Sequence, residues 1–157
     1  MIVAHNNTKY KFFWGGEFSN WFKSDFTING ITYNCGEQGM MHQKALLFKD
    51  YEIADKILKT KNPADQKRLG REIKNFHQHL WNVSKYNLVK DVLREKYNQN
   101  PELKEYLLQH KDCEIIEAST VDRIWGIGFH ESDALEHIDE WGENLLGNIL
   151  TELANEL

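Results

Sequence analysis

The amino-acid sequence predicts a mainly helical α+β fold, in which one domain over residues 1–157 carries a small antiparallel sheet. Patterns typical of strands are confined to the first thirty-odd residues and one short later segment, and helical periodicity fills most of the remainder. A length of 157 residues with 41% hydrophobic residues suits a single core. No linker, repeat or low-complexity tract divides the chain, so one domain is expected.

The predicted strands come first in the chain. Residues 11–14 (Lys-Phe-Phe-Trp) are apolar or aromatic apart from the lysine, and two glycines follow them. Residues 26–28 and 31–33 flank Asn29-Gly30, which is the strongest short signal for a β-hairpin. One more strand is predicted at residues 114–118, ahead of a glycine-containing loop.

The pattern becomes helical from Asn34 onward. Asn34, with Glu37 three residues later, resembles a capping box at the start of a helix. Asn62-Pro63 and Asn100-Pro101 are each typical of an N-cap followed by the first helical residue. Further helices are predicted at 51–58, 64–74, 80–97, 102–109 and 145–157, and the last of these places a row of leucine and isoleucine residues on one face.

Composition excludes several classes of protein. The net charge of -5 and the absence of a basic stripe argue against a dedicated duplex-DNA binder, although a single nucleotide could still be held. The two cysteines form no CxxC pair, and neither a signal peptide nor an apolar run of membrane-spanning length is visible, which favours the cytoplasm. The seven histidines lack the spacing of a metal site, and no nucleotide-cofactor motif occurs.

One helix carries the first candidate site. Glu37, Met41 and Lys44 lie at positions i, i+4 and i+7, so they share one helical face. From spacing alone, a surface glutamate and lysine beside a buried methionine is the simpler interpretation, because both charged residues are common on surfaces.

A second candidate is the loop that follows the predicted strand at 114–118. Asp122 precedes Trp125-Gly126-x-Gly128, which places a carboxylate, an indole and accessible backbone amides in one loop. An indole stacks on a base or sugar, and glycines let the backbone approach a phosphate or ribose. An ordinary turn with Trp125 buried in the core explains the pattern equally well.

Two further segments leave alternatives open. Asn144 is placed to cap the last helix, whose N-terminus would then either bind an anion or simply be capped. Gly147 is unusual in a first helical turn and indicates close approach of another backbone or a ligand. Residues 15–21, Gly-Gly-Glu-Phe-Ser-Asn-Trp, suit either the rim of a sugar site or a plain turn.

An ordered set of short motifs extends over nearly the whole chain. Its members are Phe18-Ser19-Asn20, Tyr33, Glu37-Gln38, Lys44-Ala45, Trp81, Lys96-Tyr97, Asn100-Pro101-x-Leu103, Glu117-x-Ser119-x-x-Asp122-x-x-Trp125-Gly126-x-Gly128 and Gly142-x-Asn144-x-x-Gly147. Each piece alone is weak, but the set in this order resembles the NADAR (YbiA-like) family.

This resemblance implies an N-glycosidase that hydrolyses the bond between a ribose, phosphoribosyl or ADP-ribosyl, and a base. The implied substrates are a ribosylamino-pyrimidine of riboflavin biosynthesis or ADP-ribosyl-guanine, with ADP-ribosylated nucleic acid as a further partner; a flipped-out base would suffice. The resemblance implies three catalytic residues, Glu37, Lys44 and Asp122, and six substrate-binding residues: Asn20, Trp81, Ser119, Trp125, Gly126 and Asn144.

Under this hypothesis Asp122 or Glu37 supplies the acid–base proton. A desolvated Lys44 offers a second route, because a neutral amine can form a Schiff base with the ring-opened sugar. Neither a metal nor a cofactor is expected.

Two other classes of function compete with the enzyme. One is a module that binds ADP-ribose or an NAD-derived nucleotide without cleaving it, and such a module would not need both Glu37 and Lys44. The other is a helical interaction protein that uses the leucine-rich face of residues 146–157, although that face is more simply core.

Overall fold

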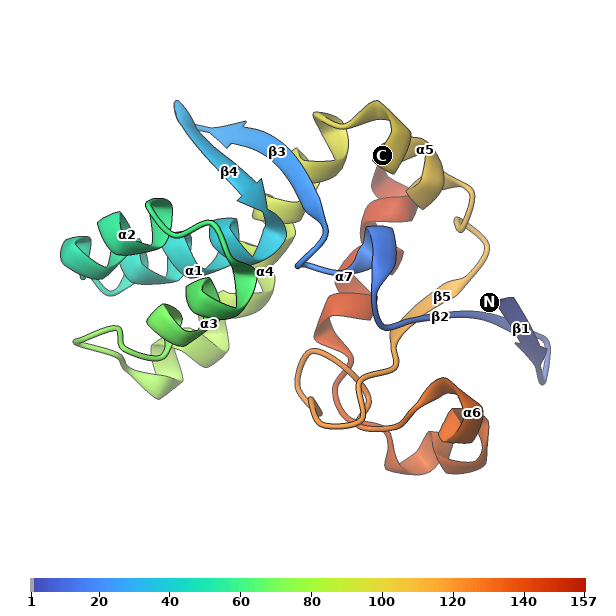
Figure 1. Cartoon of the computed structure of the whole chain (residues 1–157). Coiled ribbons are helices and arrows are strands. Elements are labelled where there is room, and N and C mark those ends of the chain that lie inside the picture. Colours follow the sequence, from blue (N-terminus) through green and yellow to red (C-terminus); the bar gives the residue numbers. More distant parts are fainter. Residues whose placement is uncertain (1) are drawn as a thin grey trace. The chain divides into compact units, whose positions relative to one another are not determined.

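A computed structural model describes residues 2–157 (Figure 1). It confirms the predicted helical α+β class. Packing divides the chain into two compact units, one made of residues 2–19 with 102–157 and the other of residues 20–101. The single domain over residues 1–157 stays a prediction, and the two units are described separately below.

The unit of residues 2–19 and 102–157 contains a three-stranded sheet in the order β1-β2-β5. β1 (Ile2–His5) pairs antiparallel with β2 (Thr8–Phe13), whereas β2 pairs parallel with β5 (Glu114–Glu117). The predicted antiparallel pairing is present in β1–β2, while the parallel pair β2–β5, which the sequence did not predict, makes this sheet mixed. About a hundred residues separate β2 from β5, and a connection of that length can return to the starting edge, as a parallel pair requires.

The helices of this unit include α7 (Leu145–Glu156), which packs on β5 (Figure 1). The predicted apolar face of α7 is confirmed as core, because Leu146, Ile149, Leu150 and Leu153 are at most 2% exposed. The fold therefore covers most of the face that a helical interaction protein would have used. The shorter helices are η1 (Gly16–Phe18), α5 (Pro101–Leu108), α6 (Glu131–Ala134) and η2 (Leu135–Glu140).

Gly147 is explained by backbone packing within the same unit. A Cβ atom at this position would lie 2.1 Å from the carbonyl oxygen of Ile115 in β5. The glycine thus lets the first turn of α7 approach the strand, which is the backbone alternative of the two that the sequence left open.

The unit of residues 20–101 begins with the predicted hairpin. β3 (Lys23–Ile28) and β4 (Ile31–Cys35) pair antiparallel. Asn29 and Gly30 both adopt positive φ angles, 50° and 81°, as a two-residue hairpin turn of type I′ requires.

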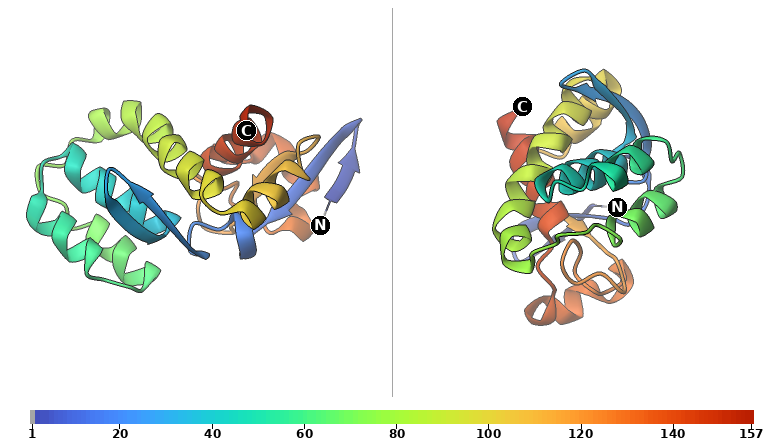
Figure 2. Two further views of the ribbon diagram at one scale, coloured as in Figure 1. Left: turned by 90° about the horizontal axis from the view of Figure 1, so that it is seen from above. Right: turned by 90° about the vertical axis from the view of Figure 1, so that its left-hand side faces the viewer.

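Four helices complete this unit: α1 (Gly36–Leu47), α2 (Tyr51–Leu58), α3 (Pro63–Gly70) and the long α4 (Gln78–Asn98). α1 contacts the other three helices and β4, and Figure 2 shows it among them. Its first seven residues are all buried. Gly39 allows the close approach of α4, because a Cβ atom there would lie 2.7 Å from Cγ1 of Val92.

The predicted helix starts have mixed outcomes. Asn62 accepts a hydrogen bond from the Ala64 backbone N–H at 2.8 Å, with Pro63 at the first helical position, as predicted. The capping box at Asn34 is wrong: α1 begins at Gly36 after Cys35, whose side chain does not cap it. The helix predicted at 64–74 ends at Gly70, because residues 71–77 leave the helical path.

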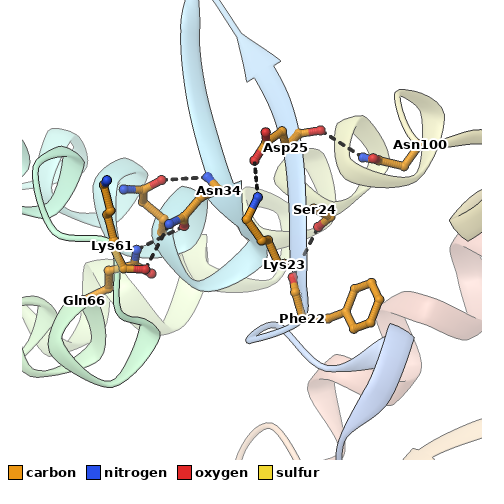
Figure 3. A network of polar contacts seen from close by, with 9 residues as sticks. Phe22, Lys23, Ser24, Asp25, Asn34, Lys61, Gln66 and Asn100 are labelled. Atoms are coloured by element: carbon orange, nitrogen blue, oxygen red, sulfur yellow. Dashed lines mark hydrogen bonds and ion pairs between the residues drawn. The ribbon is translucent and has the colours of Figure 1, made fainter.

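Pro101 does begin α5, but the side chain of Asn100 does not act as predicted. Its Nδ2 donates to the carbonyl oxygens of Lys96 and Asp25, at 2.7 and 3.0 Å. The side chain thus links the end of α4 to β3 (Figure 3).

A network of amides ties the end of β4 to α3 (Figure 3). Gln66 is fully buried; its Nε2 donates to Oδ1 of Asn34 at 3.1 Å, and its Oε1 accepts from the thiol of Cys35 at 3.2 Å. Nδ2 of Asn34 donates to the carbonyl oxygen of Lys61 at 2.9 Å. Because Gly36 follows directly, this network fixes where α1 begins and so where its side chains point.

Across residues 2–157, none of the helices has the length and apolar character needed to span a bilayer.

Candidate functional site

Lys44 lies in a largely aromatic environment near the end of α1. Its Nζ is 5.1 Å from the centre of the Phe76 ring and 5.1 Å from the centre of the Trp81 ring. The same nitrogen donates to the carbonyl oxygen of Gly70, the last residue of α3, at 3.2 Å. The amine is therefore held at a defined place by three residues between positions 70 and 81, far from Lys44 in the sequence.

Close helix packing creates the contact between Lys44 and α3. A Cβ atom at Gly70 would lie 2.0 Å from Sδ of Met41, which is one turn before Lys44 in α1. Only a glycine leaves room for this methionine without a shift, and the tight packing brings the Gly70 carbonyl within reach of the lysine.

The electrostatics of Lys44 differ from those of a surface lysine. Burial lowers its pKa from the ordinary 10.5, and the positive charge of Arg71 lowers it further, while Glu37 opposes the change. The direction is the one predicted for a desolvated amine. A larger share of the neutral, nucleophilic form is thus present near neutral pH than in an exposed lysine.

Glu37 occupies the first turn of the same helix and is only 6% exposed. Its backbone N–H donates to the carbonyl oxygen of Asn20 at 2.9 Å. The simpler interpretation from spacing, a solvent-facing glutamate, is therefore wrong for Glu37.

Asn20 adds an acceptor beside the start of α1. Its Oδ1 packs against Gly36, 2.9 Å from where a Cβ atom would lie. This oxygen is buried and has no hydrogen-bond donor among residues 2–157. A buried acceptor of this kind usually has a partner, so a donor from outside the described residues would satisfy it.

In the other unit, the loop after β5 is built by side-chain hydrogen bonds to its own backbone. Oγ of Ser119 accepts from the N–H of Asp122 at 3.0 Å. Oδ1 of Asp122 accepts from the N–H groups of Ile124 and Trp125, at 2.9 and 2.8 Å. One carboxylate oxygen of Asp122 thus holds the turn that presents Trp125.

Gly126 in this loop is explained by the protein's own backbone. A Cβ atom there would lie 2.8 Å from the carbonyl oxygen of Glu117 and 3.0 Å from that of Asp122. The glycine therefore serves loop packing, whereas the sequence suggested close approach to a phosphate or ribose. Trp125 is partly exposed.

Asn144 precedes α7 in the left-handed conformation, with φ 51°. Its side chain does not cap α7, contrary to the prediction. Instead Oδ1 accepts from the Glu117 N–H at 2.9 Å, and Nδ2 donates to the Ile115 carbonyl at 3.1 Å. These bonds hold the start of α7 against β5, so a substrate-binding role for Asn144 remains a prediction.

The predicted site residues thus fall into two groups. Residues 20–101 contain Asn20, Glu37, Lys44 and Trp81, of which Lys44 and Trp81 are in contact and Glu37 acts on Lys44 electrostatically. The other unit contains Ser119, Asp122, Trp125, Gly126 and Asn144, which share one loop and the start of α7.

Sequence reasoning missed Phe76 and gave Lys96 no role beyond its place in the ordered motifs. Phe76 lies in the irregular segment 71–77 and offered no periodic signal. Lys96 is fully buried, and burial lowers its pKa to about 8. A signal for Lys96 was available: it follows Val89, Val92 and Leu93 at helical spacing, on an otherwise apolar face.

Comparison with known proteins gives the family of this chain. Residues 12–157 match the model of the NADAR domain, so the chain belongs to the NADAR family. An N-glycosidase of Acanthamoeba polyphaga mimivirus is 37% identical over 163 residues, which cover 94% of this chain and 96% of the relative.

More distant relatives agree. The N-glycosidase YbiA of Escherichia coli is 28% identical over 142 residues, covering 90% of this chain and 81% of YbiA. A riboflavin biosynthesis protein of Vibrio vulnificus is 30% identical over 142 residues, which are 90% of this chain but 35% of that protein. The NMR structure of E. coli YbiA superposes with a TM-score of 0.78 at 25% identity, covering 98% of this chain and 86% of that one.

The predicted family is confirmed by these matches. The names of the relatives give the enzyme class that the sequence predicts: N-glycosidases, which are hydrolases acting on N-glycosyl compounds.

Proposed function

We propose that this chain is an N-glycosidase that hydrolyses the bond between a ribosyl group and the amine nitrogen of a base. The observation that carries the proposal is the partly buried amine of Lys44, held between two aromatic rings on the same helix as the buried carboxyl group of Glu37. An acid–base group and a desolvated amine are what cleavage of an aminal bond at C1 needs.

The chemistry runs through C1 of the ribose. A proton delivered to the ring oxygen opens the ribose while the lone pair of the base nitrogen forms a C1=N bond. The neutral amine of Lys44 adds to C1, and its proton passes to the base nitrogen. The C1–N bond to the base then breaks, which leaves the base with the electron pair and joins C1 to Nζ as a Schiff base.

Water completes the reaction. It adds to C1, the C1–Nζ bond breaks, and the freed aldehyde recloses as the ribose hemiacetal. Glu37 is the group proposed to deliver and recover protons in both halves. Simple acid–base hydrolysis without the Schiff base is the competing route, and Asp122 is the second candidate for its proton donor.

Other residues are assigned to binding. Trp81 closes one side of the Lys44 amine, and Asn20 offers its buried Oδ1 to a ribose hydroxyl. Trp125 supplies an indole for stacking, on a turn that Ser119 and Asp122 hold in shape. Gly126 and Asn144 contribute by fixing that loop and the start of α7.

The proposed substrate is a small ribosyl compound, either a phosphoribosylamino-pyrimidine of the riboflavin type or ADP-ribosyl-guanine, free or on nucleic acid. The first type is supported by the name of the Vibrio relative. The net charge of -5 favours a single nucleotide over a long nucleic-acid footprint. We place the reaction in the cytoplasm, which suits two buried thiols that form no disulfide.

A substrate panel tests the proposal. Wild-type protein is mixed with each candidate ribosyl compound, and released base is measured by mass spectrometry. We expect release from at least one compound, and a loss of at least a hundredfold in Glu37→Gln and Lys44→Ala, with folding checked by circular dichroism. Lys67→Ala, an exposed lysine on α3, is the control and should keep full activity.

Two results would overturn parts of the proposal. Near-wild-type release by either variant would remove that residue from the mechanism. Tight binding of ADP-ribose with no base released from any compound would instead identify a binding module.

A further inference from the structure

The groups that surround the Lys44 amine differ in how exposed they are to solvent. Of the two rings that lie 5.1 Å from Nζ, Trp81 is only 8% exposed whereas Phe76 is 41% exposed. On a third side the carbonyl oxygen of Gly70 accepts a hydrogen bond from the amine. Phe76 is therefore the more accessible of the two rings beside the amine.

Phe76 is held in place although its segment has no regular structure. Its ring packs against Phe48, at the end of α1, with ring centres 5.1 Å apart. Two residues earlier, the backbone N–H of Lys74 donates to Oδ2 of Asp50 at 2.8 Å. Oδ1 of the same carboxylate caps α2 through the Ile53 N–H at 3.1 Å.

Asp50 is therefore the anchor of this segment. It is only 7% exposed, and it fastens residues 71–77 to the start of α2. Ile73, which precedes Lys74, is buried. An aromatic ring that is supported from behind and exposed in front is suited to stacking on a planar heterocycle.

We propose that Phe76 is a substrate-contacting residue, that the leaving base stacks on its exposed ring while C1 faces Lys44, and that Asp50 is the positioning residue for it. This inference rests on the proposed function and deepens it, because it assigns the base, rather than the sugar, to one side of the amine. The segment 71–77 is then a determinant of which bases are accepted.

The kinetic test compares Phe76→Ala, Phe76→Tyr and the control Tyr51→Ala, which removes another exposed ring of the same unit. KM should rise about tenfold or more in Phe76→Ala, since loss of one base-stacking ring has effects of this size. Phe76→Tyr should stay within about twofold of wild type, as should Tyr51→Ala. The rise should be larger for a bicyclic base than for a pyrimidine. An unchanged KM in Phe76→Ala would overturn the proposal.

A second measurement does not depend on turnover. Formaldehyde with cyanoborohydride methylates accessible lysines, and peptide mapping gives the rate at Lys44. At a pH of about 10.5 an ordinary lysine amine is about half neutral and one with a lowered pKa is more so, so protonation can change the rate at Lys44 by no more than about twofold and a larger difference comes from access. Phe76→Ala should speed methylation of Lys44 severalfold, and Tyr51→Ala should not.

The two measurements separate the possible failures. Suppose that the wild-type protein releases no base but that methylation of Lys44 is faster in Phe76→Ala. The proposed glycosidase function then fails, whereas the conclusion that Phe76 shields the Lys44 amine stands. If base is released and Phe76→Ala changes neither KM nor methylation, the function stands and the role of Phe76 is refuted.

Discussion

Asp50 shows how one buried carboxylate shapes the surroundings of the site. Its pKa lies below the ordinary 3.8, chiefly because the carboxylate accepts the Lys74 N–H and secondarily because it accepts the Ile53 N–H. A lowered folded-state pKa means that Asp50 stabilises the fold above the unfolded-state value, and that this contribution is lost as the pH falls through the folded-state value.

Asp50→Asn should therefore lower the free energy of unfolding by about 1–2 kcal/mol at pH 7, because the amide oxygen of asparagine can still cap α2 but its nitrogen cannot accept the Lys74 N–H. The deficit should shrink at acidic pH, as the pH falls through the lowered folded-state pKa and the wild-type carboxyl group also becomes protonated. Urea titrations at both pH values measure it, with the exposed Asp65→Asn as control. A deficit that does not change with pH would show that the charge of Asp50 is unimportant.

At the scale of single residues, the sequence predicted which residues belong to the candidate site better than it predicted what surrounds their side chains. Ordered motifs singled out Glu37 and Lys44, and the structure places Glu37 in the interior and Lys44 between two rings. The rings come from residues more than thirty positions further along the chain. No local pattern could predict that Phe76 would reach Lys44, since the contact depends on how Asp50 folds the segment back.

At the scale of elements, the packing of α3 against α1 sets the position of the amine. Gly70 contacts Met41 and also accepts the hydrogen bond of Lys44. An alanine at position 70 must either displace the sulfur of Met41 or move the last turn of α3 away from Lys44.

Gly70→Ala should lower the free energy of unfolding by about 1–3 kcal/mol, the usual cost of overpacking. Base release should fall as well, because the Gly70 carbonyl no longer aligns Lys44. Thermal unfolding and the release assay measure the two effects. Lys67→Ala, on the exposed side of α3, should change neither. If Gly70→Ala were as stable and active as wild type, the close packing of α3 would not matter for the site.

Turn and N-cap signals in the sequence predicted helices and strands correctly where tertiary packing did not compete with them. Asn29-Gly30 gave a hairpin and Asn62-Pro63 a helix start, as expected. The signal at Asn34 failed, because Oε1 of Gln38 takes the Asn34 backbone N–H and Gln66 takes its side chain. The bond from Gln66 arises only once α3 packs against the hairpin.

At the scale of the whole molecule, the order of motifs along the chain was the most informative signal. It identified the NADAR family, which the family model confirms over residues 12–157. It did not predict the parallel pairing of β2 with β5, because a pairing between residues about a hundred positions apart leaves no local trace. The glycines at 126 and 147 were recognised as unusual, and both turn out to serve backbone packing.

The account depends on Lys44 acting as an amine on C1 of a ribosyl substrate. Adding borohydride during turnover and measuring the intact mass tests this directly, because borohydride reduces a Schiff base to a stable amine. We expect the mass to increase by one reduced sugar moiety, mapped to the peptide that carries Lys44, and no increase in Lys44→Ala. Continued release of base without any adduct on Lys44 would contradict the account.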